Sequence, residues 1–197
     1  MSAALRAPER IVIASGKISA EKGDGRLELN RFFDRAIRAA FHDLGVADDV
    51  AAEYLASMLT RFARTENLYP RGTAMPRLET VVDMLLEIQA VWQDDSPDFR
   101  PEHEVTVRRH IGDYTLFMTG LFPERVQRTA SMGYYVSEGK RAYRFVSEHD
   151  RARGGGERSP YRRLAERFEA YMRALDYTRR AYFFGPGLPP FFRPNFG

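Results

Sequence analysis

The sequence predicts an all-α protein, a single-domain bundle of about six helices, and three observations support this class. Apolar residues recur at steps of three and four along most of the chain, which places them on one face of an α-helix. Strand and helix patterns do not alternate, and no repeat of fixed length is found. With 197 residues, 44% of them hydrophobic, the chain can bury a substantial core. We expect a weakly structured segment over 1–25, a helical domain over 26–183 and a tail over 184–197.

The first two helices are predicted over the segment that begins near Leu27. The apolar positions of the first are Leu29, Phe33, Ala36, Ala40 and Leu44. Gly45 follows, where the end of a helix favours glycine. The apolar positions of the second are Ala51, Leu55, Met58 and Phe62. Asp48 and Asp49 lie in its opening turn, where negative charge interacts favourably with the helix dipole.

Two further helices are predicted on either side of the segment DDSPDF. The apolar positions of the third are Leu78, Val82, Leu85, Ile88 and Trp92. The fourth begins at Glu102 or Glu104 and continues into the segment HIGDYTLFMTGLFPERV. Residues 114–122 of that segment are nine consecutive uncharged residues. A helix that is apolar on all sides is normally surrounded by other helices, so we expect this one at the centre of the bundle.

The last two helices are predicted on either side of a flexible glycine-rich connection. Pro123 is suited to the first position of the fifth helix. The fifth repeats Met132, Tyr135, Val136, Gly139, Tyr143 and Val146 on one side. The sixth repeats Tyr161, Leu164, Phe168, Tyr171, Leu175, Thr178 and Tyr182. The glycines expected to let helices approach one another closely are Gly112, Gly120, Gly133 and Gly139.

Asp113 precedes the uncharged stretch, and the sequence leaves three roles open for it. In the first, it caps a short buried helix that begins at Tyr114, with Gly112 in the bend. In the second, the helix continues through Asp113, and the carboxylate pairs with an arginine of a neighbouring helix, since a buried charge requires a partner. In the third, Asp113 faces a ligand cavity. The other polar residues that would line this cavity are His110, Tyr114, Tyr134 and Tyr135.

Three segments, IGDYTLFMTGLFPERV, YYVSEGKRAYRFVSE and PYRRLAERFEAYMRALD, resemble a family of all-helical bacterial proteins that has no assigned function. The similarity covers residues 45–183. This resemblance implies an all-helical fold and supplies no catalytic residue that can be placed on this sequence. It therefore supports the fold and leaves the function open.

Several classes of site are absent from the sequence. The chain has no cysteine, which excludes disulfides, thiolate zinc sites and cysteine nucleophiles. No histidine has a glutamate three residues before it, as di-iron bundles require, so we predict no metal and no cofactor. His110, which follows two arginines, is expected at the surface or as a cap. Neither a nucleophile elbow nor a phosphate-binding loop is present.

The charge distribution bears on nucleic-acid binding. The net charge is +3, and residues 151–182 contain nine arginines against four acidic residues. Arginines with interleaved tyrosines can hold phosphates and stack on bases. However, Tyr161, Tyr171 and Tyr182 fall on the apolar face of the sixth helix, which favours a place in the core. Nucleic acid is therefore not the expected partner, and nucleic-acid binding through this Arg-rich C-terminal half is the second alternative for the function.

The tail has the most unusual composition in the chain. Residues 183–197 contain five phenylalanines, four prolines and three glycines. Such a segment cannot form a helix, and apolar groups of this size mark a contact surface. The phenylalanines expected to make that contact are Phe184, Phe191, Phe192 and Phe196. The tail either folds back onto its own bundle or binds a second subunit.

These observations favour a non-catalytic cytoplasmic protein that acts through protein–protein contact, with a homodimer as one form of it. Neither a secretory signal nor an apolar run long enough for a membrane span is found, which is the basis for the expected cytoplasmic location. The alternative is a bundle that binds a small apolar ligand, such as a lipid, an isoprenoid or a tetrapyrrole, between its helices.

Overall fold

The computed structural model describes residues 24–63, 65–69, 72, 79–93, 101–155 and 159–183. Every regular element within these ranges is helical, so the all-α class is confirmed. The predicted N-terminal segment, except its last two residues, lies outside the described residues. The whole predicted tail also lies outside them, with Phe184, Phe191, Phe192 and Phe196.

The described helices follow one another in chain order with short connections. They are α1 (Asp24–Asp43), α2 (Asp49–Phe62), α3 (Thr65–Leu68), α4 (Val81–Gln93), α5 (Pro101–Leu121), α6 (Pro123–Thr129), α7 (Met132–Ala152), α8 (Tyr161–Glu166), α9 (Phe168–Thr178) and a π-helical turn, η1 (Arg179–Phe183). Within these described ranges, no helix combines the length and the apolar character needed to cross a membrane.

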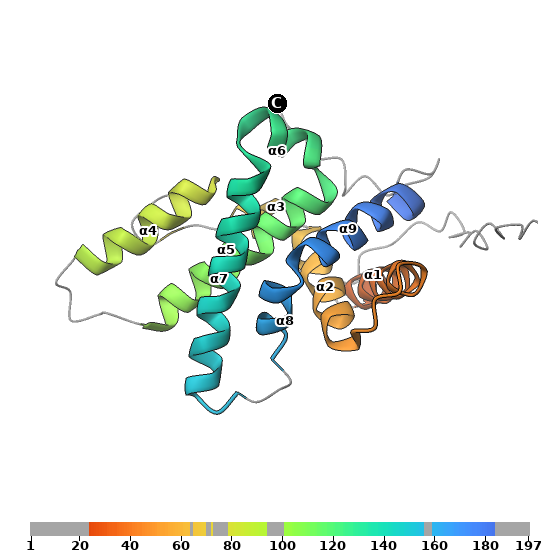
Figure 1. Ribbon diagram of the computed structural model, residues 1–197, viewed down its shortest axis with the longest axis horizontal. Helices are drawn as coiled ribbons and strands as arrows, with labels where there is room; N and C mark the ends of the chain where they lie inside the picture. The colour runs from red at the N-terminus through yellow and green to blue at the C-terminus, as the bar shows by residue number, and fades with distance from the viewer. Residues whose placement is uncertain are drawn as a thin grey trace, which may run out of the picture.

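Helix α5 contributes the largest buried segment, because all of its residues 111–121 are buried. It packs along α7 and against α9, α4 and α6. Helices α1 and α2 form an antiparallel pair at one end of the molecule, where α9 covers α1, and α4 lies at the opposite end (Figure 1). The core therefore runs along α5 and α7 and continues beneath the α1–α2 pair.

Two of the predicted helices are interrupted in the structure. The predicted fifth helix stops at Ala130, whose extended backbone (φ −159°, ψ 176°) separates α6 from α7. The predicted sixth helix is broken at Arg167 (φ −114°, ψ 25°), which separates α8 from α9. With the short helix α3 added, the described residues form nine α-helical segments where the sequence predicted six.

The turn between α1 and α2 follows the predicted signals. Gly45 has a φ of +64°, a left-handed conformation that favours glycine at the end of a helix. Asp48 is the N-cap of α2, and its side chain accepts a hydrogen bond from the backbone N–H of Ala51 at 3.0 Å. These two residues set where α1 ends and where α2 begins.

Three of the four glycines lie where helices approach closely, as predicted. A Cβ added at Gly112 would lie 2.6 Å from the Tyr143 ring, and one added at Gly120 would lie 2.6 Å from Leu175. A Cβ at Gly139 would meet the Phe168 ring at the same distance. The prediction for Gly133 is wrong. The nearest atom to an added Cβ there is the Ser131 hydroxyl, at 3.6 Å.

Candidate functional site

Asp113 lies in the second half of α5 and is almost completely buried, with 3% of its surface exposed. Its Oδ1 accepts hydrogen bonds from the hydroxyls of Tyr54 and Tyr143 at 2.6 and 2.8 Å. Its Oδ2 accepts one from the Arg61 guanidinium at 2.6 Å. The capping interpretation is wrong, because α5 is continuous from Pro101 to Leu121 and Asp113 lies inside it. The interpretation as a buried ion pair is confirmed.

The two tyrosines in this cluster are held as hydrogen-bond donors. Burial raises the pKa of Tyr54 and of Tyr143 well above the ordinary value, and the negative charge of Asp113 raises both further. Both phenols therefore remain protonated and keep donating to the carboxylate. Because both oxygens of Asp113 are engaged, the cluster is suited to joining α2, α5 and α7 rather than to proton transfer.

The other predicted pocket residues form a separate aromatic group. The rings of His110 and Tyr114 lie 6.3 Å apart, and those of Tyr114 and Tyr135 lie 6.2 Å apart. Tyr134 contacts the buried Tyr135 but lies at the surface itself, with 36% of the Tyr134 surface exposed. Asp113 forms its hydrogen bonds with different partners, so the five predicted residues fall into two groups. Ligand binding by these residues stays a prediction.

His110 was expected at the surface or as a cap: the surface position is wrong, whereas its contact with Leu68, the last residue of α3, agrees with a cap. Its ring is partly buried between α3 and α5, edge-on to Phe62, and its Nε2 lies 3.1 Å from the carbonyl oxygen of Leu68. Burial lowers the pKa of His110, although the negative charge of Asp113 opposes this effect. The neutral imidazole therefore donates its Nε2–H to the carbonyl and links α5 to the short helix α3.

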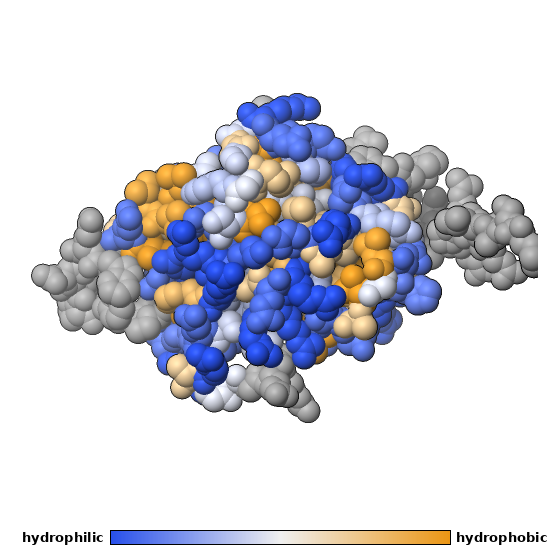
Figure 2. Space-filling model, in the orientation of Figure 1, coloured by the Kyte–Doolittle hydropathy of each residue, from blue (hydrophilic) through white to orange (hydrophobic). Residues whose placement is uncertain are grey.

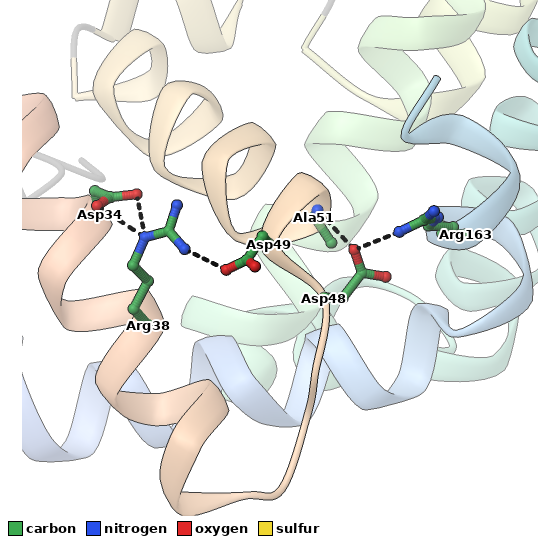
Figure 3. Close-up of polar contacts among 6 residues, drawn as sticks. All are labelled: Asp34, Arg38, Asp48, Asp49, Ala51 and Arg163. Atoms are coloured by element: carbon green, nitrogen blue, oxygen red, sulfur yellow. Dashed lines mark hydrogen bonds and ion pairs between the residues drawn. The ribbon is translucent and has the colours of Figure 1, made fainter. Parts of the chain in front are cut away.

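Asp48 forms a second buried cluster, at the start of α2. Besides capping the helix, it accepts hydrogen bonds from the Tyr171 hydroxyl at 2.8 Å and from the Arg163 guanidinium at 3.1 Å. Figure 3 shows its carboxylate between Ala51 of α2 and Arg163 of α8. Burial alone would raise the pKa of Asp48, but these three donors outweigh that effect and lower it. Asp48 therefore joins α2 to α8 and α9.

The outward face of α4 carries two exposed aliphatic residues, followed by the exposed Gln89. Val82 and Leu86, one turn apart, have 53% and 44% of their surfaces exposed. The opposite face, with Val81, Met84 and Ile88, is buried. Figure 2 shows the resulting concentration of hydrophobic residues over α4. The sequence predicted Val82 on the buried side, and this was wrong because a helix with apolar residues on more than one side leaves its orientation undetermined.

The polar clusters of Asp113 and Asp48 were only partly predictable. The sequence marked both acids, one at the edge of an apolar stretch and one at a helix start. It did not identify their tyrosine and arginine partners, which lie on other helices. The only available signal was that Tyr143 and Tyr171 fall on apolar helix faces, where a buried hydroxyl requires a hydrogen-bond partner.

In the part of the chain that the structure describes, no three His, Asp or Glu side chains converge into a set that could hold a metal ion. Compared with known proteins, the chain matches no protein-family model, no curated protein and no solved structure. The basis for a function is therefore the geometry of this molecule.

Proposed function

We propose that this protein acts through protein–protein contact, without catalysis, and that the apolar face of α4 is the contact surface. The observation that carries the proposal is the exposure of Val82 and Leu86 on the outer side of an end helix. A helix at the edge of a monomer normally presents polar residues to water. Large aliphatic side chains on adjacent turns are instead typical of a surface that a partner covers.

The proposed partner is a second copy of the same chain, through its residues 184–197. This segment is rich in phenylalanine and proline, and its single charged side chain is Arg193. The α4 face carries no basic side chain, and Asp83 lies beside Val82, so the charges are complementary. η1, which precedes the segment, and α4 lie at opposite ends of the molecule (Figure 1). In this proposal the segment of one copy binds α4 of another, and two reciprocal contacts would form a closed dimer.

Sedimentation velocity over a range of protein concentrations tests this proposal. We expect the full chain to associate. The double variant Val82→Glu, Leu86→Glu should sediment as a monomer, because burial of each aliphatic side chain contributes about 1.5–3 kcal/mol. Deletion of residues 184–197 should have the same effect.

The matched control is Leu27→Glu, which places the same charge on an exposed leucine of α1. This variant should associate like the full chain. The proposal is wrong if the full chain is monomeric at every concentration, or if Leu27→Glu disrupts association as strongly as the α4 substitutions.

A further inference from the structure

A second feature of the surface is a hollow between α7 and α8, which pack side by side (Figure 1). Its volume is about 490 Å³, within the range of small-ligand sites. Helix α7 contributes Arg144, Ser147, Glu148 and Arg151, whose spacing of three, four and seven residues places them on one face. We call this space the α7–α8 hollow.

The α7–α8 hollow is rich in positive charge. Four arginines line it against two acids, Glu148 and Glu166. Those arginines are Arg144, Arg151, Arg162 and Arg163. Among the described residues, Arg163 alone of the four takes part in an ion pair, the one with Asp48. Arg144, Arg151 and Arg162 therefore line one space and form no ion pair with any described residue, so an anion bound between them would gain three favourable charge contacts.

Several groups around the hollow are held in place. Arg163 is fixed by its hydrogen bond to the buried Asp48, which anchors this wall to the start of α2. The Ser159 hydroxyl donates to Asp150 at 2.9 Å, and the backbone N–H of Gly155 donates to the Asp150 carbonyl at 2.8 Å. These contacts hold Gly155 and Ser159, two of the residues that line the hollow, so ordering them on binding costs little.

We propose that the α7–α8 hollow binds a small molecule that carries a diphosphate or triphosphate group. A guanidinium group can donate two parallel hydrogen bonds to the oxygens of one phosphate. Three guanidinium groups can therefore bind the oxygens of two or three linked phosphates. The hydroxyl of Ser147 adds an uncharged hydrogen-bond donor to the lining of the hollow. Glu148 and Glu166 limit the net positive charge, which favours a compact anion in the hollow over a long polyanion across the surface.

Isothermal titration calorimetry of the full chain with inorganic triphosphate, at constant ionic strength, tests the proposal. We expect one molecule bound per chain, with inorganic phosphate binding much more weakly. Arg144→Gln and Arg162→Gln should each raise Kd by about tenfold, through loss of a charge-assisted contact. Glu148→Gln should lower Kd, because it removes a negative charge from the lining. A general loss of folding could not produce this tighter binding.

The control is Arg128→Gln, which removes the same charge from an exposed position on α6. It should leave Kd unchanged. The proposal is overturned if inorganic triphosphate does not bind, or if Arg128→Gln weakens binding as much as Arg144→Gln. It is also overturned if the affinity for single-stranded oligonucleotides rises steadily with their length and exceeds that for triphosphate, because that result indicates a nucleic-acid surface.

Discussion

Asp113 receives hydrogen bonds from tyrosines that lie 59 and 30 residues away along the chain. From sequence, the acid could be placed at the edge of an apolar stretch, where it would cap a helix, pair with an arginine or face a cavity. The choice among these roles depended on whether α5 continued through Asp113. The identity of its partners depended on how α2 and α7 are rotated against α5, which spacing within one helix does not determine.

Replacing Asp113 should destabilise the protein strongly. Asp113→Ala leaves two buried hydroxyls and Arg61 without their acceptor, and we expect the free energy of unfolding to fall by about 3 kcal/mol. Tyr54→Phe removes one donor to the carboxylate and should cost about 1.5–3 kcal/mol. Urea denaturation measures both changes.

Asp34 provides a control for this comparison, because it pairs with Arg38 one turn away at the surface of α1. Such pairs contribute at most about 0.5 kcal/mol. If Asp34→Ala and Asp113→Ala lower the free energy of unfolding equally, the buried cluster contributes no more to stability than a surface pair.

His110 should make stability depend on pH. Because burial lowers its pKa in the folded protein, the unfolded chain takes up a proton at a higher pH than the folded chain does. Stability should therefore fall as the pH decreases below about 6.5, until the folded histidine is also protonated. His110→Gln should reduce this loss between about pH 7 and about pH 5, measured by denaturation at each pH. The control is His42→Gln, which replaces an exposed histidine. This variant should lose as much stability over the same pH range as the unsubstituted protein.

At the scale of elements, the sequence identified the apolar faces better than the breaks between helices. The breaks at Ala130 and Arg167 differ in how predictable they were. Thr129 and Ser131 flank the first, and such side chains compete for backbone hydrogen bonds, so a signal was present. The second break left no such signal. The apolar residues keep their helical spacing across Arg167, since that spacing depends on which side of the helix is buried and not on whether each backbone hydrogen bond is α-helical.

The contact between α7 and α9 at Gly139 predicts opposite effects of two glycine substitutions. Gly139→Ala adds a methyl group that meets the Phe168 ring and the Thr115 hydroxyl, so it should destabilise by about 1–3 kcal/mol despite the better helix propensity of alanine. Gly133→Ala has space around it and should stabilise by up to about 1 kcal/mol. Thermal unfolding distinguishes them, and a stabilising Gly139→Ala would show that the helices can separate without cost.

At the scale of the whole molecule, the all-α class was predictable because helical periodicity is a local property. The position of each helix among its neighbours was not. Helix α4 shows the difference: Val82 was expected on its buried face, yet Val82 is exposed at the end of the molecule, together with Leu86. Local composition cannot distinguish a core helix from one that a partner covers.

The end position of α4 predicts uneven local stability. Its main packing partner is α5, whereas α5 also packs against α6, α7 and α9. We therefore expect the backbone amides of α4 to exchange hydrogen faster than those of residues 111–121, because α4 can open without disrupting the rest of the core. Hydrogen exchange with mass spectrometry at low protein concentration measures this difference. Equal protection of both helices would indicate that α4 unfolds only with the whole molecule.

The cluster at Asp48 has a consequence for synthesis on the ribosome. Arg163 and Tyr171 are translated 115 and 123 residues after Asp48. While the nascent chain is shorter than this, α1 and α2 can pair, but the carboxylate that caps α2 has only water and its own helix as hydrogen-bond donors. The early helical pair therefore acquires its final support only after residue 171 has left the exit tunnel.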